Sequence, residues 1–212
     1  MLAPQAQTRR ERRIAERQAQ ILEAAAIEFS QKGYGRATTR EIAARADLSE
    51  GTLYNYFNNK QDLLSGVART FADDITQKIA AIEADNIEDM MTQLLTDRFS
   101  SGRERRLFML FLYEAPLNPD VQRIYVQEAL YRIIDATEER FRQLIASGAM
   151  RPVDPATAAQ AISATIMGFG ALFELGRHAR SKNGKEPFSA QTMGQEVTDL
   201  FFNGMRPAQD GN

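Results

Sequence analysis

The stretch from Thr38 to Leu63 constrains the fold of this chain most, because it carries start and stop signals for two short helices only a few residues apart. Thr38 and Glu41 have the spacing of a capping box, which predicts that a helix begins there. That helix would bury three apolar side chains on one face, those of Ile42, Ala43 and Ala46. It would end at the polar segment 47–49, and it is too short to be stable without packing against another helix.

A second short helix is predicted after this turn, with Ser49 as its N-cap. Leu53 and Phe57 are four residues apart, so both face inward. The other side carries small or polar residues, namely Gly51, Thr52, Asn55 and Tyr56. Such a compact polar face suits a helix that enters the DNA major groove and touches base edges. A helix pair that only packs would explain Leu53 and Phe57, but not the polar cluster 54–56 followed by Lys60.

The order of residues here resembles the DNA-binding domain of TetR/AcrR-type transcriptional regulators. The similarity rests on a helix that begins with Thr and contains Ile-Ala-x-x-Ala, followed by Ser-x-Gly-Thr-Leu-Tyr-x-Tyr-Phe-x-x-Lys-x-x-Leu. One position departs from the family, which usually has Gly at the turn where this chain has Asp47. Because Asp tolerates the left-handed backbone conformation, the turn can still form.

Two groups of residues in this stretch are predicted to contact DNA. Thr39, Arg40 and Lys60 lie at helix starts, where hydroxyls, N–H groups and positive charge can clamp phosphates. The resemblance implies that the Tyr56 hydroxyl also contacts phosphate, and that neighbouring residues approach bases or backbone. Glu50 has two interpretations: it complements the helix dipole, or it accepts a hydrogen bond from cytosine N4. The predicted DNA-binding residues are Thr38, Thr39, Arg40, Ser49, Glu50, Gly51, Thr52, Tyr54, Asn55, Tyr56 and Lys60.

Composition limits the alternatives. The chain has 212 residues, 43% of them hydrophobic, which is enough for a sizeable core. The net charge is −2, yet residues 1–62 hold 10 Lys and Arg against 8 Asp and Glu. The absence of cysteine excludes a disulfide scaffold and fits the reducing cytoplasm, where we expect the protein to act. Residues 1–13 lack the apolar segment of a secretory signal. The most apolar run, 158–173, is too short to span a membrane.

The remaining chain is expected to be helical throughout, giving an all-α fold. The first core helix would end near Gly33. An unbroken apolar stripe from Leu64 to Ile82 would link the DNA-binding domain, here called the head, to the helical remainder of the chain, here called the body. Asn118-Pro119 and Asp154-Pro155 each combine a cap with a proline at the first helical position. Four segments are expected: a flexible basic arm (1–13), a three-helix DNA-binding domain with the helix-turn-helix (14–62), a helical effector-binding and dimerisation domain (63–206) and a tail (207–212).

The middle of the chain is rich in Met and Phe, which suits ordinary core or an adaptable apolar cavity. Polar side chains there could orient a bound molecule. The candidate ligand-binding residues are Met91, Leu94, Arg106, Phe108, Phe111, Tyr113, Glu114, Tyr125, Tyr131, Met167 and Phe173. His178 has no catalytic partners in the sequence, and neither metal spacing nor a phosphate-binding glycine loop is present, so no enzyme activity, metal or cofactor is predicted.

These observations predict a DNA-binding transcriptional regulator that is a homodimer and binds a double-stranded operator. The resemblance implies a repressor whose last two helices form a four-helix dimer interface, and whose small-molecule effector shifts the separation of the two heads. Two alternatives remain open: an all-α enzyme or small-molecule-binding protein with an incidental helix pair, and a regulator without any effector.

Overall fold

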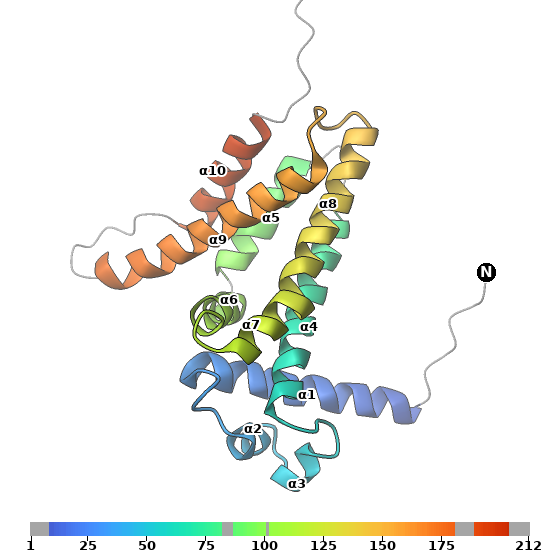
Figure 1. Ribbon diagram of the computed structural model, residues 1–212, viewed down its shortest axis with the longest axis vertical. Coiled ribbons are helices and arrows are strands. Elements are labelled where there is room, and N and C mark those ends of the chain that lie inside the picture. Colours follow the sequence, from blue (N-terminus) through green and yellow to red (C-terminus); the bar gives the residue numbers. More distant parts are fainter. Residues whose placement is uncertain (1–8, 82–86, 101, 181–188, 204–212) are drawn as a thin grey trace, which may run out of the picture.

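The computed structural model describes residues 9–81, 87–100, 102–180 and 189–203, and this part of the chain is helical without any strand (Figure 1). The helices are α1 (Arg9–Lys32), α2 (Thr39–Arg45), α3 (Glu50–Leu53), α4 (Lys60–Ala80), α5 (Ile87–Ser100), α6 (Gly102–Glu114), α7 (Pro119–Tyr125), the π-helical turn η1 (Val126–Leu130), α8 (Tyr131–Ala146), α9 (Pro155–Arg180) and α10 (Ala190–Asn203). The predicted all-α fold, with a helix-turn-helix head and a helical body, is confirmed.

The head consists of α1, α2 and α3, and its turns follow the predicted capping chemistry. Thr38 and Glu41 form the complete capping box of α2. Ser49 caps α3 by accepting a hydrogen bond from the backbone N–H of Thr52 at 3.1 Å. Asp47 adopts a left-handed backbone conformation with φ 55°. The Asp at this turn therefore takes the conformation that a glycine would favour.

Helix α4 connects the head to the body (Figure 1). Its apolar stripe begins in the head with Leu63 and Leu64 and continues to Ile75 and Ile79, all of them buried. The same hydrophobic core includes residues of α1, α2, α3, α6 and α7. The predicted domain boundary at residue 62 therefore falls inside the first turn of α4, and the head does not have a core of its own.

The helices of the body pack in two groups (Figure 1). Helix α8 lies beside α4 and α9, while α10 lies against α5. Asn118 caps α7 with Pro119 in the first turn, as predicted. The turn η1 joins α7 to α8 into the long helix expected from residue 118 to about 147, and Gly148 ends it with φ 80°. A second core is formed by residues of α5, α8 and α9 together with Met150, and it contains no residue of the head.

One predicted segment is wrong in part. The sequence predicts a flexible arm over residues 1–13, but α1 begins at Arg9, so the last five residues of that arm are helical. Apolar periodicity is lacking here because these turns do not pack on the core, and residues 9–13 are all exposed. Residues 1–8 and the predicted tail, 207–212, lie outside the described residues.

Candidate functional site

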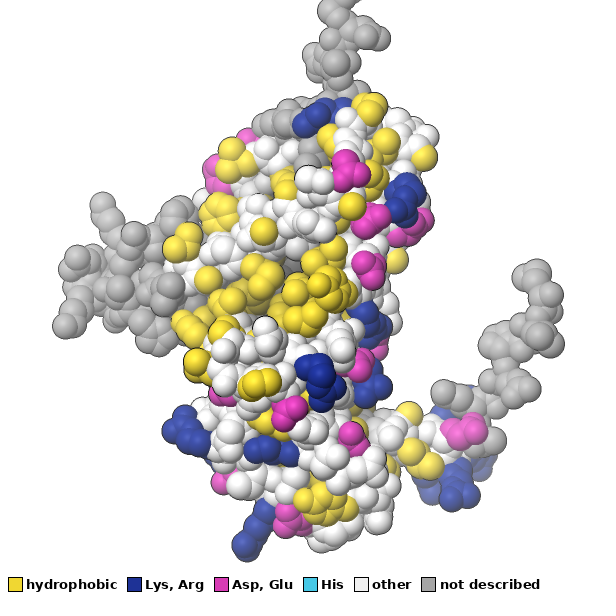
Figure 2. Space-filling view, in the orientation of Figure 1, with side chains coloured by type: hydrophobic (Ala, Val, Ile, Leu, Met, Phe, Trp, Pro, Cys, Tyr) yellow, Lys and Arg dark blue, Asp and Glu magenta, His cyan; other side chains and the backbone are white. Residues whose placement is uncertain are grey.

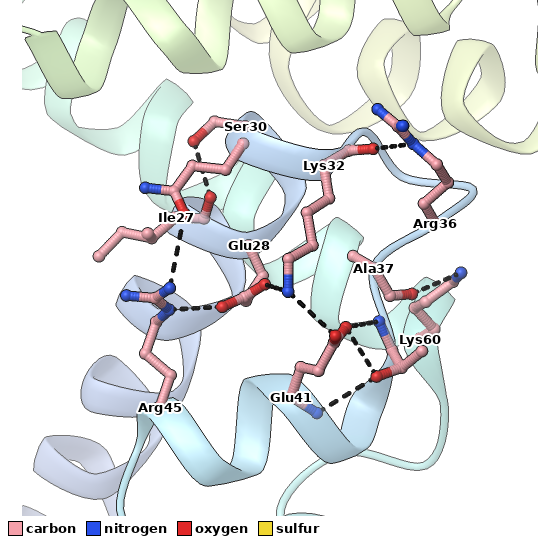
Figure 3. A network of polar contacts seen from close by, with 11 residues as sticks. Ile27, Glu28, Ser30, Lys32, Arg36, Ala37, Glu41, Arg45 and Lys60 are labelled. Carbon is pink, nitrogen blue, oxygen red and sulfur yellow. Dashed lines mark hydrogen bonds and ion pairs between the residues drawn. The ribbon is translucent and has the colours of Figure 1, made fainter.

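Charged side chains tie α2 to the last turns of α1 (Figure 3). The buried carboxylate of Glu28 lies 2.7 Å from Lys32 Nζ and 2.7 Å from Arg45 Nε. Lys32 also contacts the carboxylate of Glu41 at 3.0 Å. The hydrogen bond from Lys32 lowers the pKa of Glu28, and it likewise lowers the pKa of Glu41. Both ends of α2 are thus held by α1, which fixes the orientation of the two short helices.

Three predicted DNA-binding residues from α2 and α3 are joined by hydrogen bonds. The Thr39 hydroxyl donates to Glu50 Oε1 at 2.5 Å and lies 3.2 Å from the Tyr54 hydroxyl. Glu50 and Thr39 are half-buried, whereas Tyr54 is 46% exposed. The hydrogen of the Thr39 hydroxyl is thus directed to Glu50 in this arrangement, and a phosphate contact by Thr39 stays a prediction.

The other predicted residues divide into capping and exposed groups. Thr38 caps α2, and the hydroxyl of Ser49 contacts that of Thr52 at 2.8 Å. The exposed group consists of Arg40, Gly51 and Asn55. A Cβ added at Gly51 would have only Ser49 Oγ nearby, at 3.9 Å, so this part of α3 is open to close approach. The helices that carry these residues lie at the end of the head remote from the body (Figure 1).

Lys60 is engaged inside the head. Its ammonium donates to the carbonyls of Tyr34 at 2.8 Å, Gly35 at 3.3 Å and Ala37 at 3.1 Å. It also lies 4.5 Å from the centre of the Tyr34 ring. An ammonium has three N–H groups, so all of them have partners, and Lys60 fastens the start of α4 to the loop between α1 and α2. A phosphate contact by Lys60 stays a prediction.

The first turns of α1 add positive charge beside the recognition region. Arg9, Arg10, Arg13 and Ile14 line a concavity of about 450 Å³ together with Tyr56. Figure 2 shows Lys and Arg side chains gathered at this projecting end of α1. Within the described residues, Arg9, Arg10 and Arg13 form no ion pair. Because Tyr56 is the predicted phosphate ligand, the basic end of α1 and the recognition region form one surface.

The body contains a cavity of about 60 Å³. Its apolar walls come from α4, α5, α8 and α9, and Figure 2 shows hydrophobic side chains at mid-height of the molecule. Of the candidate ligand-binding residues, Met91, Tyr125 and Met167 line this cavity. The polar lining groups, which sequence reasoning missed, are Glu104, Thr137, Arg140 and Ser163. Glu104 is paired with Lys78 of α4 at 3.2 Å.

Several other candidates do not line the cavity. Phe108 and Phe111 are buried in the packed core. Tyr113 and Tyr131, which are candidates for orienting a bound molecule, are 52% and 58% exposed. The π-helical turn η1 separates Tyr131 from Tyr125, so the spacing expected for an α-helix does not give the direction of Tyr131 relative to Tyr125. Leu94, Phe173 and His178 have side chains outside the described residues.

Arg106 and Glu114 also lie away from the cavity. With Tyr113 they line a separate surface depression of about 300 Å³ between α1 and α6. An added Cβ on Gly33 would lie 2.5 Å from Glu114 Oε1, so α6 closely approaches the loop after α1. These three residues therefore belong to the junction between head and body, where α6 packs against α1.

Small and apolar residues are exposed on α9 and α10. Ala161, Ala164 and Gly168 are exposed on α9, and Leu172 is 68% exposed one turn later. Leu200 of α10 is 70% exposed. A Cβ added at Gly168 would meet nothing within 4 Å, so this glycine is not needed for packing inside the chain.

The described part of the chain holds neither a membrane span nor a metal cluster. None of its helices has the length and apolar character required to cross a membrane. Its Asp and Glu side chains form no group of three or more that could hold a metal ion.

Comparison with known proteins identifies both halves of the chain. Residues 21–67 match bacterial regulatory proteins of the tetR family, and residues 89–178 match the C-terminal domain of AefR-like transcriptional repressors. The uncharacterised HTH-type transcriptional regulator YhgD of Bacillus subtilis is 29% identical over 146 residues, which cover 64% of this chain and 72% of that protein. Nucleoid occlusion factor SlmA of Photobacterium profundum is 31% identical over 143 residues, which cover 68% of this chain and 64% of that protein.

The fold agrees with these matches. A transcriptional regulator from Saccharomonospora viridis, solved in complex with choline, superposes with a TM-score of 0.66 and 21% identity, over 90% of this chain and 98% of that one. Both matched families and YhgD are described as transcriptional regulators or repressors and not as enzymes. The helix-turn-helix, its exposed polar face and both family matches lead to one conclusion. The chain belongs to the TetR family of transcriptional regulators.

Proposed function

We propose that this protein is a homodimeric, cytoplasmic repressor that binds a double-stranded operator through α2, α3 and the basic end of α1, and that a small, largely apolar molecule releases it. The observation that carries the proposal is the course of α4. At one end Lys60 holds the loop of the head, and at the other end Ile75 and Ile79 line the body cavity. A change in the shape of the cavity would therefore move α4, the helix that positions the head.

The match of residues 89–178 to a repressor domain supports the repressor assignment. The complex of the Saccharomonospora viridis regulator with choline supports a ligand-responsive body, since that protein of similar fold binds a small molecule. The segments 14–62 and 63–206 remain our proposed functional division, although one core joins them. Selection of bound sequences from random duplexes tests the proposal directly, because a repressor should enrich one two-fold symmetric site.

The basic end of α1 should contribute phosphate contacts. In the double variant Arg10→Gln/Arg13→Gln, the slope of log affinity against log salt concentration should become shallower by about two, one for each lost contact. Base preference should stay the same, because phosphate contacts carry no sequence information. Fluorescence anisotropy over a salt series measures this slope.

The control is Arg142→Gln, which removes one positive charge from an exposed site on α8, where Arg142 is paired with Glu138 and Glu139. It should leave the slope unchanged. An unchanged slope in the double variant would show that the end of α1 does not touch DNA, and an equal change in the control would indicate only a general charge effect.

The exposed small-residue face of α9 and α10 is the proposed dimer interface. Gly168→Leu should weaken the dimer by roughly 1–3 kcal/mol through overpacking, while the single chain tolerates the change because nothing lies near the new Cβ. Sedimentation should show a shift towards monomer with unchanged helicity, and Gly168→Ala should have a smaller effect. If sedimentation showed that the wild type is a monomer at micromolar concentration, the proposed dimer interface would be wrong.

A further inference from the structure

The hydrogen bonds between α2 and α3 determine which atoms the head can offer to a base. Thr39 Oγ1 lies 2.5 Å from Glu50 Oε1 and 3.2 Å from the hydroxyl oxygen of Tyr54. Thr39 stands in the first turn of α2, and the other two residues come from α3 and its C-cap. The three side chains thus form one chain of contacts across the face that we assign to DNA.

Counting the hydrogen atoms shows which group donates in each of these contacts. An ionised carboxylate can only accept, so the single hydroxyl hydrogen of Thr39 goes to Glu50. The contact between Thr39 and Tyr54 then needs a hydrogen from the tyrosine, which donates to Thr39 Oγ1. Both hydroxyl hydrogens are therefore used inside the protein. Outward, this cluster presents only acceptors: Glu50 Oε2, for which no hydrogen bond is found among the described residues, and the lone pairs of the Tyr54 oxygen.

We propose that Glu50 is a specificity-determining residue that accepts a hydrogen bond from the N4 amino group of a cytosine in each operator half-site. The inference rests on the proposed function, because it needs α3 to lie in the major groove. There the only donors on base edges are the N4 group of cytosine and the N6 group of adenine. Guanine and thymine present acceptors, which a carboxylate repels.

Cytosine is favoured over adenine for an electrostatic reason. In the major groove, adenine N6 lies between two acceptors, its own N7 and O4 of the paired thymine, whereas cytosine N4 has an acceptor on one side only, O6 of the paired guanine. A carboxylate that approaches adenine therefore meets more repulsion than one that approaches cytosine. The negative charge of Glu50 acts mainly by rejecting the wrong bases, since discrimination between sites is a difference of affinities.

Thr39 is a positioning residue in this arrangement. Its hydroxyl holds Oε1 of Glu50 and leaves Oε2 as the reading atom, so the carboxylate does not have to be ordered when DNA binds. Loss of the hydroxyl should weaken the preference at the same base pair that Glu50 reads, and at no other. A role of Thr39 in stability alone would lower affinity equally for all sequences.

The test selects binding sites from random duplexes with the full-length wild type, Glu50→Ala, Thr39→Val and, as a control on the same helix face, Asn55→Ala. The wild type should enrich a cytosine at one position of each half-site, and its replacement should lower affinity about 5- to 150-fold. Glu50→Ala should remove the preference at this position only. Thr39→Val should reduce it there, and Asn55→Ala should act at a different position.

A chemical probe isolates the contact. When 2-pyrimidinone, which lacks the N4 amino group, replaces the selected cytosine, the wild type should lose affinity and Glu50→Ala should not. If the wild type enriches a site but Glu50→Ala keeps the same cytosine preference, the inference is overturned and the proposed function stands. If the wild type enriches no common site, the proposed function fails, and the inference fails with it.

Discussion

Replacing Phe111 with aspartate should unfold much of the protein, so that operator binding and any effector response are lost together. Phe111 is completely buried, its ring stacks on Tyr125 with centroids 4.8 Å apart, and it lies 6.1 Å from the ring of Phe71. These contacts join α4, α6 and α7 in the core that also supports the head. A buried unpaired charge at this position has no compensating partner.

The milder variant Phe111→Ala gives a measurable magnitude. It should lower the free energy of unfolding by about 3–5 kcal/mol, which is a large part of the roughly 5–15 kcal/mol that stabilises an ordinary protein. Urea denaturation followed by circular dichroism measures this loss. A fully stable Phe111→Ala that binds operator but ignores effector would show instead that Phe111 lines a ligand site, as its sequence context suggested.

Met91→Leu is the matched control, because Met91 is also buried but lines the cavity. A volume-conserving exchange of this kind should change stability by less than about 1.5 kcal/mol. It should alter the affinity for an effector while operator binding persists. The two substitutions thus separate core residues from cavity residues.

A molecule that binds the body cavity should reduce operator affinity about 5- to 150-fold, which corresponds to a coupling free energy of about 1–3 kcal/mol. The cavity of about 60 Å³ is far smaller than the roughly 300–1,000 Å³ of most ligand sites. Binding must therefore separate the surrounding helices, among them α4. A ligand that favours this expanded arrangement acts only through its unequal affinity for the two states.

Reciprocity provides the measurement. A compound found by thermal-shift screening is titrated by calorimetry into the protein alone and into its operator complex, and operator must weaken its binding by the same factor. Ile166→Phe, which fills the cavity from α9, should abolish binding of the compound and keep operator affinity. Equal affinities in the two titrations would show that the compound does not regulate the protein.

The sequence alone determined the two short helices α2 and α3 and the apolar stripe of α4. Thr38, Ser49 and Asn118 are followed by the residues that complete their caps, and capping depends on neighbours within three positions. The stripe from Leu64 onwards is likewise a local periodic signal. The residues most directly tied to family membership therefore lie where short-range chemistry decides the structure.

Only the tertiary structure decided which side chains meet. Lys60 and the carbonyl of Tyr34 are 26 residues apart, and Thr39 and Glu50 are 11 apart, so no periodicity reveals that these groups are already bonded. Met and Phe enrichment likewise could not separate the cavity wall at Met91 from the solid core at Phe111, because burial looks the same in both. The physical reason is that hydrogen-bond partners and voids depend on how helices pack against one another, whereas caps and stripes depend on a single helix.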